Sequence, residues 1–335
     1  MPREGRLSTK TRVAVFGLGH WGKNLIRNMH ALGALSVLYD SLPASRAYFA
    51  ALYPDVKMAE TPEQALASAD AIVIATPAAT HEQLVRRALA TGKHVFVEKP
   101  LCLDLAEAGT LSALARAQGR TLMVGHLLLY HPAFQALKAA FDAGRLGQLR
   151  YVYSTRLSLG KIRREENALW SFAPHDISMI LQLTGRLPRR VTAEGGQYLH
   201  PGVADTTLSH LTFDNGVQAH IFVSWIHPFK DQRLVVIGDE AMAVFNDVGT
   251  GAEKLLLYPH KARWDGEVPV VAQAKAVPIA YEAEEPLRRE CQAFLDAIAT
   301  GRPALSNPEE GIAVLRVLDA CQRALTSGSP VHLDA

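Results

Sequence analysis

The stretch Val13-Ala-Val-Phe-Gly17-Leu-Gly19-His-Trp-Gly22 decides the fold that this sequence predicts. Its apolar run predicts a buried strand, and the Gly-x-Gly-x-x-Gly spacing follows that strand and opens an amphipathic stretch. In this context the glycines permit a tight turn, close approach of a pyrophosphate and close packing of the helix, whose N-terminus attracts the anion. The alternative is that they are only turn residues. The predicted cofactor-binding residues of this loop are Gly17, Leu18, Gly19, His20, Trp21 and Gly22.

Short apolar runs continue to alternate with helical patterns as far as Gly125. Near-continuous apolar strands separated by helices predict a parallel sheet that is covered on both faces. With right-handed crossovers this gives an α/β, doubly wound Rossmann domain, which we place at residues 9–126. The expected strands are 12–16, 35–39, 71–75, 94–97 and 121–124, and the expected helices are 20–32, 43–52, 80–91 and 104–118.

The pattern changes after Gly125 to longer runs with period-two alternation. One turn signal between them, Asp214-Asn215-Gly216, is typical of a hairpin. We therefore predict a C-terminal α+β domain at residues 127–335, which binds substrate, mediates oligomerisation and contains a large, mostly antiparallel open sheet. Open sheets commonly pair between subunits, so we expect a homodimer or homotetramer. The expected strands are 149–158, 190–198, 206–213, 217–225, 232–238 and 241–246, and the expected helices are 131–143, 173–184, 285–300 and 308–326.

Composition excludes several classes of protein. The chain has 335 residues, 48% of them hydrophobic and 20% charged, which fits two folded domains. A formal net charge of +2 gives no reason to expect a nucleic acid or membrane partner. The three cysteines lack metal-ligand spacing, so we predict no disulfide and no metal. The polar stretch 1–10 does not resemble a signal peptide, and we expect a cytoplasmic protein.

Asp40 ends the second expected strand, about twenty residues after the glycine loop. A carboxylate there accepts a hydrogen bond from a ribose 2′-hydroxyl and repels a 2′-phosphate, so the sequence favours NAD over NADP. Arg46 supplies a cation that could accommodate a 2′-phosphate, so NADP remains an alternative cofactor. The other alternative for Asp40 is that it only caps a helix. After the third strand, Thr76 and Pro77 are expected to pack against the dinucleotide. His81 fits a cofactor contact and an ordinary strand-to-helix turn equally well.

Lys99 follows the apolar run Val95-Phe-Val97 at the carboxyl end of a parallel strand, where ligands bind in such sheets. There a lysine can hydrogen-bond a substrate hydroxyl, and its pKa can fall. The alternative is a surface lysine paired with Glu98.

Four blocks of sequence, GLGHWG, ATPAATH, VEKP and VGHLLLYHPAF, resemble the Gfo/Idh/MocA family of sugar and inositol dehydrogenases. The resemblance runs along nearly the whole chain and implies NAD as the cofactor. It implies that Lys99 is catalytic, lining the nicotinamide pocket and contacting the reacting hydroxyl. Glu98 and His126 are then expected beside the cofactor, His126 in the block that closes the Rossmann part against the nicotinamide.

A further block from Arg163 to Asp176 is similar to the UDP-N-acetylhexosamine 3-dehydrogenase branch of that family. The resemblance implies that His175 is the general acid/base, and its chemistry suits removal of a hydroxyl proton. The family's usual aspartate position holds Ser171 here, which puts that aspartate's role in doubt, and Asp176 ranks below His175. The expected substrate-binding residues are Arg163, Asn167, Trp170, His175 and Asp176.

The resemblance therefore implies NAD-dependent oxidation of the 3-hydroxyl of a UDP-N-acetylhexosamine to a 3-keto nucleotide sugar, preceding 3-amino sugar formation. Three alternatives remain. They are a UDP-N-acetylglucosaminuronate 3-dehydrogenase, an NADP-dependent 3-ketoreductase of a deoxysugar nucleotide, and a non-catalytic sugar-sensing regulator.

Overall fold

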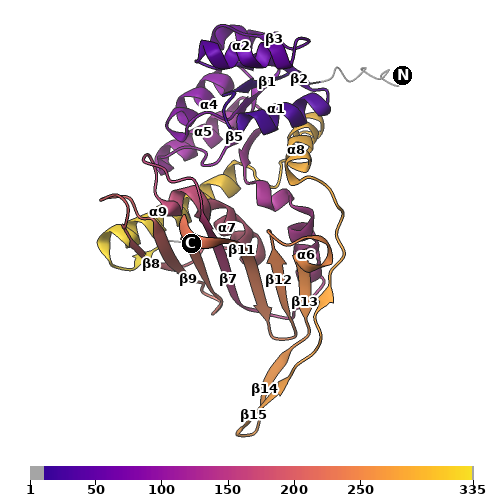
Figure 1. The fold of residues 1–335 in the computed structure, drawn as a ribbon, viewed down its shortest axis with the longest axis vertical. Coiled ribbons are helices and arrows are strands. Elements are labelled where there is room, and N and C mark those ends of the chain that lie inside the picture. The colour runs from indigo at the N-terminus through magenta and orange to yellow at the C-terminus, as the bar shows by residue number, and fades with distance from the viewer. Residues whose placement is uncertain (1–10, 334–335) are drawn as a thin grey trace. The chain divides into compact units, whose positions relative to one another are not determined.

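A six-stranded parallel sheet, in the order β3-β2-β1-β4-β5-β6, forms the centre of the first unit of the computed structural model, which describes residues 11–333 (Figure 1). The predicted doubly wound α/β fold is confirmed. The order reverses between β1 and β4, and ligands of such sheets bind at this switch point. The elements of this unit are β1 (Val13–Phe16), α1 (Gly22–Ala31), β2 (Leu35–Tyr39), α2 (Pro43–Leu52), β3 (Lys57–Met58), α3 (Pro62–Ala67), β4 (Ala71–Ile74), the 3-10 helix η1 (Ala78–Thr80), α4 (His81–Ala90), β5 (His94–Glu98), α5 (Leu105–Ala117), β6 (Leu122–Gly125) and most of α8 (Pro286–Thr300).

Strands β1 and β4 are buried along their whole length, which explains their unbroken apolar sequence. The short elements β3 and α3 were not predicted, because two strand residues and six helix residues are too few to show a period. The N-terminal stretch 1–10, where we expected no signal peptide and placed the start of the domain, lies outside the described residues.

The segment Leu287–Ile312 packs with the N-terminal unit, although it is distant in sequence. The ring of Phe294 on α8 lies 5.7 Å from that of Phe96 on β5, and Val124 N–H donates to the carbonyl of Ser306 over 2.9 Å. The expected second domain, 127–335, included this segment. The difference arises because the helical pattern of α8 shows which face is apolar but not which sheet that face will cover.

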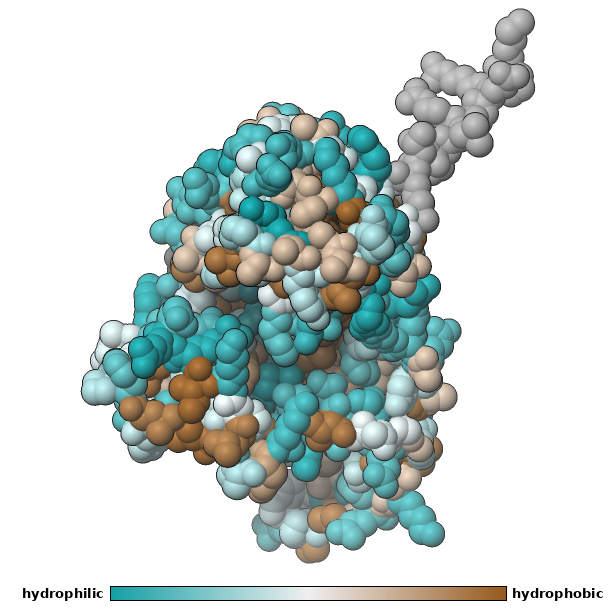
Figure 2. All heavy atoms as spheres, turned by 45° about the horizontal axis from the view of Figure 1, so that its top comes forward, coloured by the Kyte–Doolittle hydropathy of each residue, from teal (hydrophilic) through white to brown (hydrophobic). Residues whose placement is uncertain are grey.

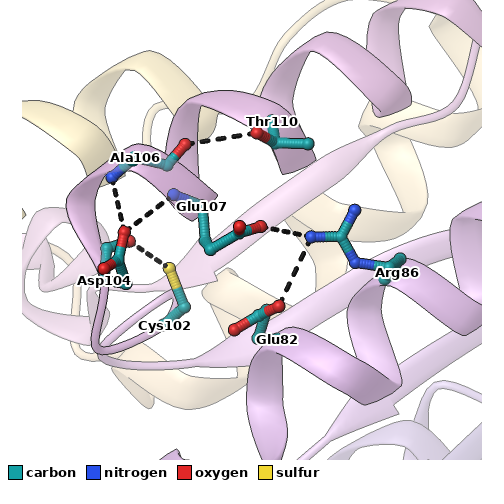
Figure 3. A network of polar contacts seen from close by, with 7 residues as sticks. All are labelled: Glu82, Arg86, Cys102, Asp104, Ala106, Glu107 and Thr110. Carbon is teal, nitrogen blue, oxygen red and sulfur yellow. Dashed lines mark hydrogen bonds and ion pairs between the residues drawn. The ribbon is translucent and has the colours of Figure 1, made fainter.

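Helices α4 and α5 are joined by a network of polar contacts (Figure 3). Arg86 on α4 pairs with Glu82 and with Glu107 on α5. Asp104 caps α5, accepting from the backbone N–H groups of Ala106 and Glu107. In the same network, the thiol of Cys102 donates to the Asp104 carbonyl over 3.0 Å, and burial raises its pKa to about 11. This thiol is therefore protonated and unreactive at neutral pH.

The second unit contains a nine-stranded sheet within the described part of the chain, in the order β16-β13-β12-β11-β7-β10-β9-β8-β17. Only the β7–β10 pair of this sheet is parallel, so the predicted mostly antiparallel sheet is confirmed. The elements of this unit are η2 (Leu127–Tyr130), α6 (Pro132–Asp142), β7 (Leu149–Leu159), α7 (Ala168–Thr184), β8 (Arg190–Gly196), β9 (Thr206–Thr212), β10 (Gln218–Ser224), β11 (Ile226–Gly238), β12 (Met242–Asn246), η3 (Gly251–Lys254), β13 (Leu255–Tyr258), β14 (Lys261–Asp265), β15 (Val268–Ala272), β16 (Val277–Pro278), most of α9 (Pro308–Ser327) and β17 (Val331–His332).

Helices α6 and α7 pack on one face of this sheet (Figure 1). The strands alternate accordingly, so that on β10 Ala219, Ile221 and Val223 are buried while the residues between them are less covered. The opposite face carries the rings of Tyr153 and His220, stacked 5.3 Å apart. This face therefore has an aromatic surface without a helix over it in the described residues.

Helix α7 begins at Ala168, five residues before its predicted start. The side chain of Asn167 caps it by accepting from Trp170 N–H over 3.1 Å. The prediction was wrong because Pro174 suggested a first turn, whereas it lies inside the helix. The strands β13 to β17 were also missed, and β14 and β15 form an exposed two-stranded hairpin.

The visible surface is largely hydrophilic, with apolar side chains in small groups (Figure 2). No helix within residues 11–333 has the length and apolar character that crossing a membrane requires.

Candidate functional site

In the glycine loop between β1 and α1, neighbouring protein atoms leave no room for a side chain at two of the three glycines. The third glycine faces open space. A Cβ on Gly17, whose φ is +90°, would lie 2.7 Å from the Ala75 carbonyl oxygen, and one on Gly22 would lie 1.9 Å from that of Gly17. A Cβ on Gly19 would meet no atom of residues 11–333 within 4 Å. Space is therefore open above Gly19, where a pyrophosphate approaches the backbone. The residues present fit a dinucleotide.

The N-terminus of α1 is suited to an anion. No side chain in the described part of the chain caps it, and its first turn contains no acidic residue. Gly19, His20 and Trp21 are exposed, whereas Gly17 and Leu18 are buried. A helix N-terminus without a competing carboxylate is a ready site for phosphate.

Asp40 lies at the end of β2 and holds the glycine loop. One carboxylate oxygen accepts from Leu18 N–H over 2.7 Å, and the other accepts from Leu42 N–H over 2.8 Å. Each oxygen keeps a second lone pair for a ribose hydroxyl. Arg46 donates to the carbonyls of Asp40 and Ser41, so its guanidinium is engaged with backbone. This arrangement suits a cofactor with a free 2′-hydroxyl.

His81 joins the ends of two strands. Its ring is 1% exposed, and its nitrogens lie 2.7 Å from the Pro100 carbonyl oxygen and 2.9 Å from that of Thr76. Burial lowers its pKa, and a neutral imidazole can donate to only one of the two carbonyls. Both nitrogens face backbone, which does not fit the expected polar contact with a cofactor. His81 instead ties together the segments after β4 and β5.

Thr76 and Pro77, also expected beside the cofactor, follow β4. The hydroxyl of Thr76 lies 2.7 Å from that of Thr80, which also donates to the Pro77 carbonyl. Both expected residues keep some exposed surface.

The end of β5 brings Glu98 to the glycine loop. The indole N–H of Trp21 donates to the Glu98 carboxylate over 2.5 Å, a contact that the sequence did not indicate. Lys99 follows and is half-buried, and the next peptide bond, to Pro100, is cis. On the neighbouring strand, Gly125 pairs with Glu98 and precedes the buried His126.

In the second unit, His175 lies on α7, half-buried, and Ser171 lies one turn earlier on the same face. Near the start of α7, Asn167 and Trp170 both donate to one side-chain oxygen of Gln322 on α9, over 2.8 and 3.1 Å. Gln322 was missed because nothing in the sequence relates it to α7.

Asp176 does not lie where a substrate-binding residue would. It is fully buried, and its carboxylate accepts from Nε and Nη2 of Arg156 on β7, over 2.8 and 3.2 Å. Arg156 was missed because it alternates within an ordinary strand pattern. The predicted contact of Asp176 with substrate does not fit this position, since its polar atoms bind the arginine.

The turn before α7 is basic and exposed. Glu166 pairs with Arg163 over 3.1 Å. The side chains of Lys161 and Arg164 are also exposed, and no protein partner is found for either among residues 11–333. In that same range, no group of three His, Cys, Asp or Glu side chains is arranged to hold a metal ion.

Comparisons with known proteins agree with this geometry. Residues 11–126 match the model of an oxidoreductase family with an NAD-binding Rossmann fold, and residues 134–244 match the GFO/IDH/MocA C-terminal domain. The chain is similar to the UDP-N-acetylglucosamine 3-dehydrogenase of Acidithiobacillus ferrooxidans, with 29% identity over 92% of this chain and 94% of that protein. A solved structure of that enzyme has a TM-score of 0.84, 27% identity, and coverage of 95% of this chain and 98% of the other.

Two further similarities are broader. A solved candidate oxidoreductase from Magnetospirillum magnetotacticum MS-1 is 35% identical, with a TM-score of 0.81 and coverage of 93% of this chain and 100% of the other. The scyllo-inositol 2-dehydrogenase (NAD(+)) of Bacillus subtilis is 27% identical over 97% of both chains.

Proposed function

Because the chain belongs to the Gfo/Idh/MocA family of NAD-binding oxidoreductases, we propose that it oxidises the 3-hydroxyl of a UDP-N-acetylhexosamine, such as UDP-N-acetylglucosamine, to a ketone. The observation that carries the proposal is the similarity to the Acidithiobacillus 3-dehydrogenase over nearly the full length of both chains. A transfer of an amino group to the 3-keto sugar would follow.

On the cofactor side, the glycine loop binds the pyrophosphate at the N-terminus of α1, and Asp40 accepts from the ribose 2′-hydroxyl. Bound NAD supplies a hydride acceptor. The open space above Gly19 and the uncapped helix support this assignment. The carboxylate of Asp40 repels a 2′-phosphate, which supports NAD over NADP.

On the substrate side, His175 takes the proton of the 3-hydroxyl while the hydride leaves the same carbon. The ammonium group of Lys99 stabilises the negative charge that develops on the oxygen. The carbon thus loses one hydride and its oxygen one proton, which leaves the ketone. The half-buried positions of His175 and Lys99 suit side chains that exchange protons and still meet a substrate.

The basic turn before α7 binds the diphosphate of the nucleotide sugar. Lys161, Arg163 and Arg164 place three cations within four residues, and charge-assisted hydrogen bonds to phosphate are strong. Asn167 and Trp170, fixed through Gln322, lie next along the chain and contact the sugar.

A second candidate is the oxidation of a free cyclitol. The similarity to scyllo-inositol 2-dehydrogenase over almost the whole chain supports it. A cyclitol has no phosphate, so this candidate gives the basic turn no role.

The test is turnover of the purified protein with NAD or NADP and a panel of alcohols. The panel contains UDP-N-acetylglucosamine, UDP-N-acetylgalactosamine, UDP-N-acetylglucosaminuronate, scyllo-inositol and myo-inositol. NADH absorbance reports turnover, and mass spectrometry detects loss of two hydrogens from the substrate. We expect oxidation of a UDP-N-acetylhexosamine, with kcat reduced about 10²- to 10⁴-fold in Lys99→Ala and His175→Ala.

Variants of the basic turn separate the candidates. Arg164→Ala should raise KM for the nucleotide sugar with little change in kcat, because a phosphate contact binds substrate and transition state alike. Oxidation of inositols alone would favour the cyclitol candidate, and oxidation of the uronate alone the 3-dehydrogenase of that acid. Preference for NADP with reduction of a keto sugar would indicate a ketoreductase. NAD binding without turnover of any compound would indicate a sensor.

We also propose assembly into a homodimer or homotetramer through the open face of the nine-stranded sheet. The aromatic rings of Tyr153 and His220 on that face support this. Light scattering during gel filtration tests it, and a monomer at micromolar concentration would exclude it. The three cysteines are unpaired and buried, which supports the proposed cytoplasmic location.

A further inference from the structure

Glu290, on α8 in the first unit, is a carboxyl group in an apolar setting. Its side chain is fully buried, and within residues 11–333 neither of its carboxyl oxygens has a hydrogen-bond partner. Burying an ionised carboxylate without donors costs several kcal/mol, far more than burying a neutral acid. The proposed function gives this group no role.

Helix α8 carries Glu290 and packs on the strand that ends at Glu98. Phe96 and Glu98 are two residues apart on a strand and point to the same face. Glu290 and Phe294 are four residues apart on a helix and share one face as well. Because the rings of Phe96 and Phe294 are in contact at 5.7 Å, α8 packs on the face of β5 that carries Glu98, and the charge of Glu98 acts on Glu290.

The Glu98 carboxylate is also held from two other directions. The Trp21 indole N–H donates to it, and a Cβ on Gly125 would lie only 2.9 Å from its second oxygen. Glu98 therefore contacts the glycine loop and lies against Gly125 of β6, at the residue that precedes Lys99. Two ionised carboxylates cannot bond to each other, because both only accept.

We propose that Glu290 is protonated and donates a hydrogen bond to Glu98, so that the two carboxyl groups form one pair that positions Trp21 and Lys99. Burial, and then the charge of Glu98, raise the pKa of Glu290 well above its usual range. The other titratable groups that flank this site in sequence are Lys99 after Glu98, His126 after Gly125, and Arg288, Arg289 and Cys291 beside Glu290. Glu290 is thus a positioning residue for NAD binding. The inference rests on the cofactor and on the role proposed for Lys99, but not on which sugar is oxidised.

Infrared spectroscopy of the full chain tests the proton directly. The wild-type protein should show the carbonyl stretch of a protonated carboxyl group at neutral pH, and this band should be absent in Glu290→Gln. The measurement needs neither substrate nor turnover. A spectrum without a protonated carboxyl group at neutral pH would overturn the proposal.

Two neutral variants test the positioning. Glu290→Gln keeps a donor for Glu98, whereas Glu290→Leu has a similar volume and no donor. We expect Glu290→Leu to weaken NAD binding roughly tenfold, because it loses one hydrogen bond to a charged group. The NAD affinity of Glu290→Gln should stay within about twofold of the wild type. Equal NAD affinity in both variants would show that Glu290 only fills space and would refute the role in positioning.

The pH dependence gives a third readout. A carboxyl group whose pKa is raised in the folded state stabilises that state at low pH, and the stability is lost as the pH rises through the raised pKa. NAD affinity and thermal stability of the wild type should therefore fall toward alkaline pH, and those of Glu290→Gln should fall less. If the two proteins respond identically between about pH 6 and pH 9, no proton is shared by this pair.

Discussion

Replacing Arg156 by methionine should destabilise the second unit strongly, because it leaves a buried charge without its partner. The side chains of Arg156 and Asp176 are 8% and 0% exposed, and two hydrogen bonds of 2.8 and 3.2 Å join them. Removing one member of a buried ion pair costs about 3–5 kcal/mol. For a unit of this size, that corresponds to a fall in Tm of roughly 6–20 °C.

The neighbours of the pair do not replace the lost contact. Asp247 lies 3.9 Å from Nη1 of Arg156, and it also meets Lys254 at 3.7 Å. Asp247 is partly exposed and retains its ion pair with Lys254. The loss of stability in Arg156→Met therefore comes from Asp176, whose buried charge is left unpaired. The double variant Arg156→Met with Asp176→Leu removes both charges and should recover most of the lost stability.

The chain contains a matched control in the pair Arg12–Asp70. Its two side-chain hydrogen bonds are 3.0 and 2.9 Å long, but the side chains are 57% and 47% exposed. Arg12→Met should change stability far less, because water and salt screen an exposed pair. Urea unfolding and calorimetry of the wild type and these three variants measure the differences in stability. Equal losses in Arg12→Met and Arg156→Met, or a double variant no more stable than the single one, would refute the argument from burial.

Three further predictions concern the cofactor loop and pH. Gly19→Ala should fold with unchanged Tm but bind NAD roughly tenfold more weakly. Gly22→Ala, whose Cβ would lie 1.9 Å from a carbonyl oxygen, should instead lose stability. If calorimetric titration shows unchanged NAD affinity in the Gly19 variant, that result would count against the pyrophosphate site. Asp40→Asn should narrow the preference for NAD over NADP about tenfold by removing the charge, and an unchanged Kd ratio would mean that Asp40 does not select the cofactor. Burial lowers the pKa of His131 to about 4, so stability should fall as pH drops from about 6.5 toward 4. His131→Asn, which can still cap its helix, should reduce that fall in Tm.

The first unit could be predicted from sequence because each of its long strands is a separate apolar run. The residues of β1 and β4, and the central residues of β5, are buried, so their apolar composition alone reveals them. The same logic failed for β3, which has two residues. It also failed for the start of α7, where Pro174 obscured a helix that a side-chain cap begins earlier.

Those parts of the candidate site could be predicted whose position depends only on the spacing of nearby residues along the chain. The glycine loop and Asp40 depend on a turn and on one strand end, and both lie as that spacing requires. The partners of Asp176 and Trp21 depend on side chains far away in sequence, Arg156 and Glu98. Such pairings are set by packing, which hydrophobic periodicity does not encode.

The covering of β5 by α8 also orders events during synthesis on the ribosome. Phe96 emerges about 200 residues before Phe294, which packs against it. At a translation rate of about 5–20 residues per second, the apolar face of β5 stays uncovered for roughly 10–40 seconds until α8 has been synthesised. During that time the nascent N-terminal unit presents an incomplete surface to chaperones. A chain terminated before residue 287 would keep that surface exposed permanently.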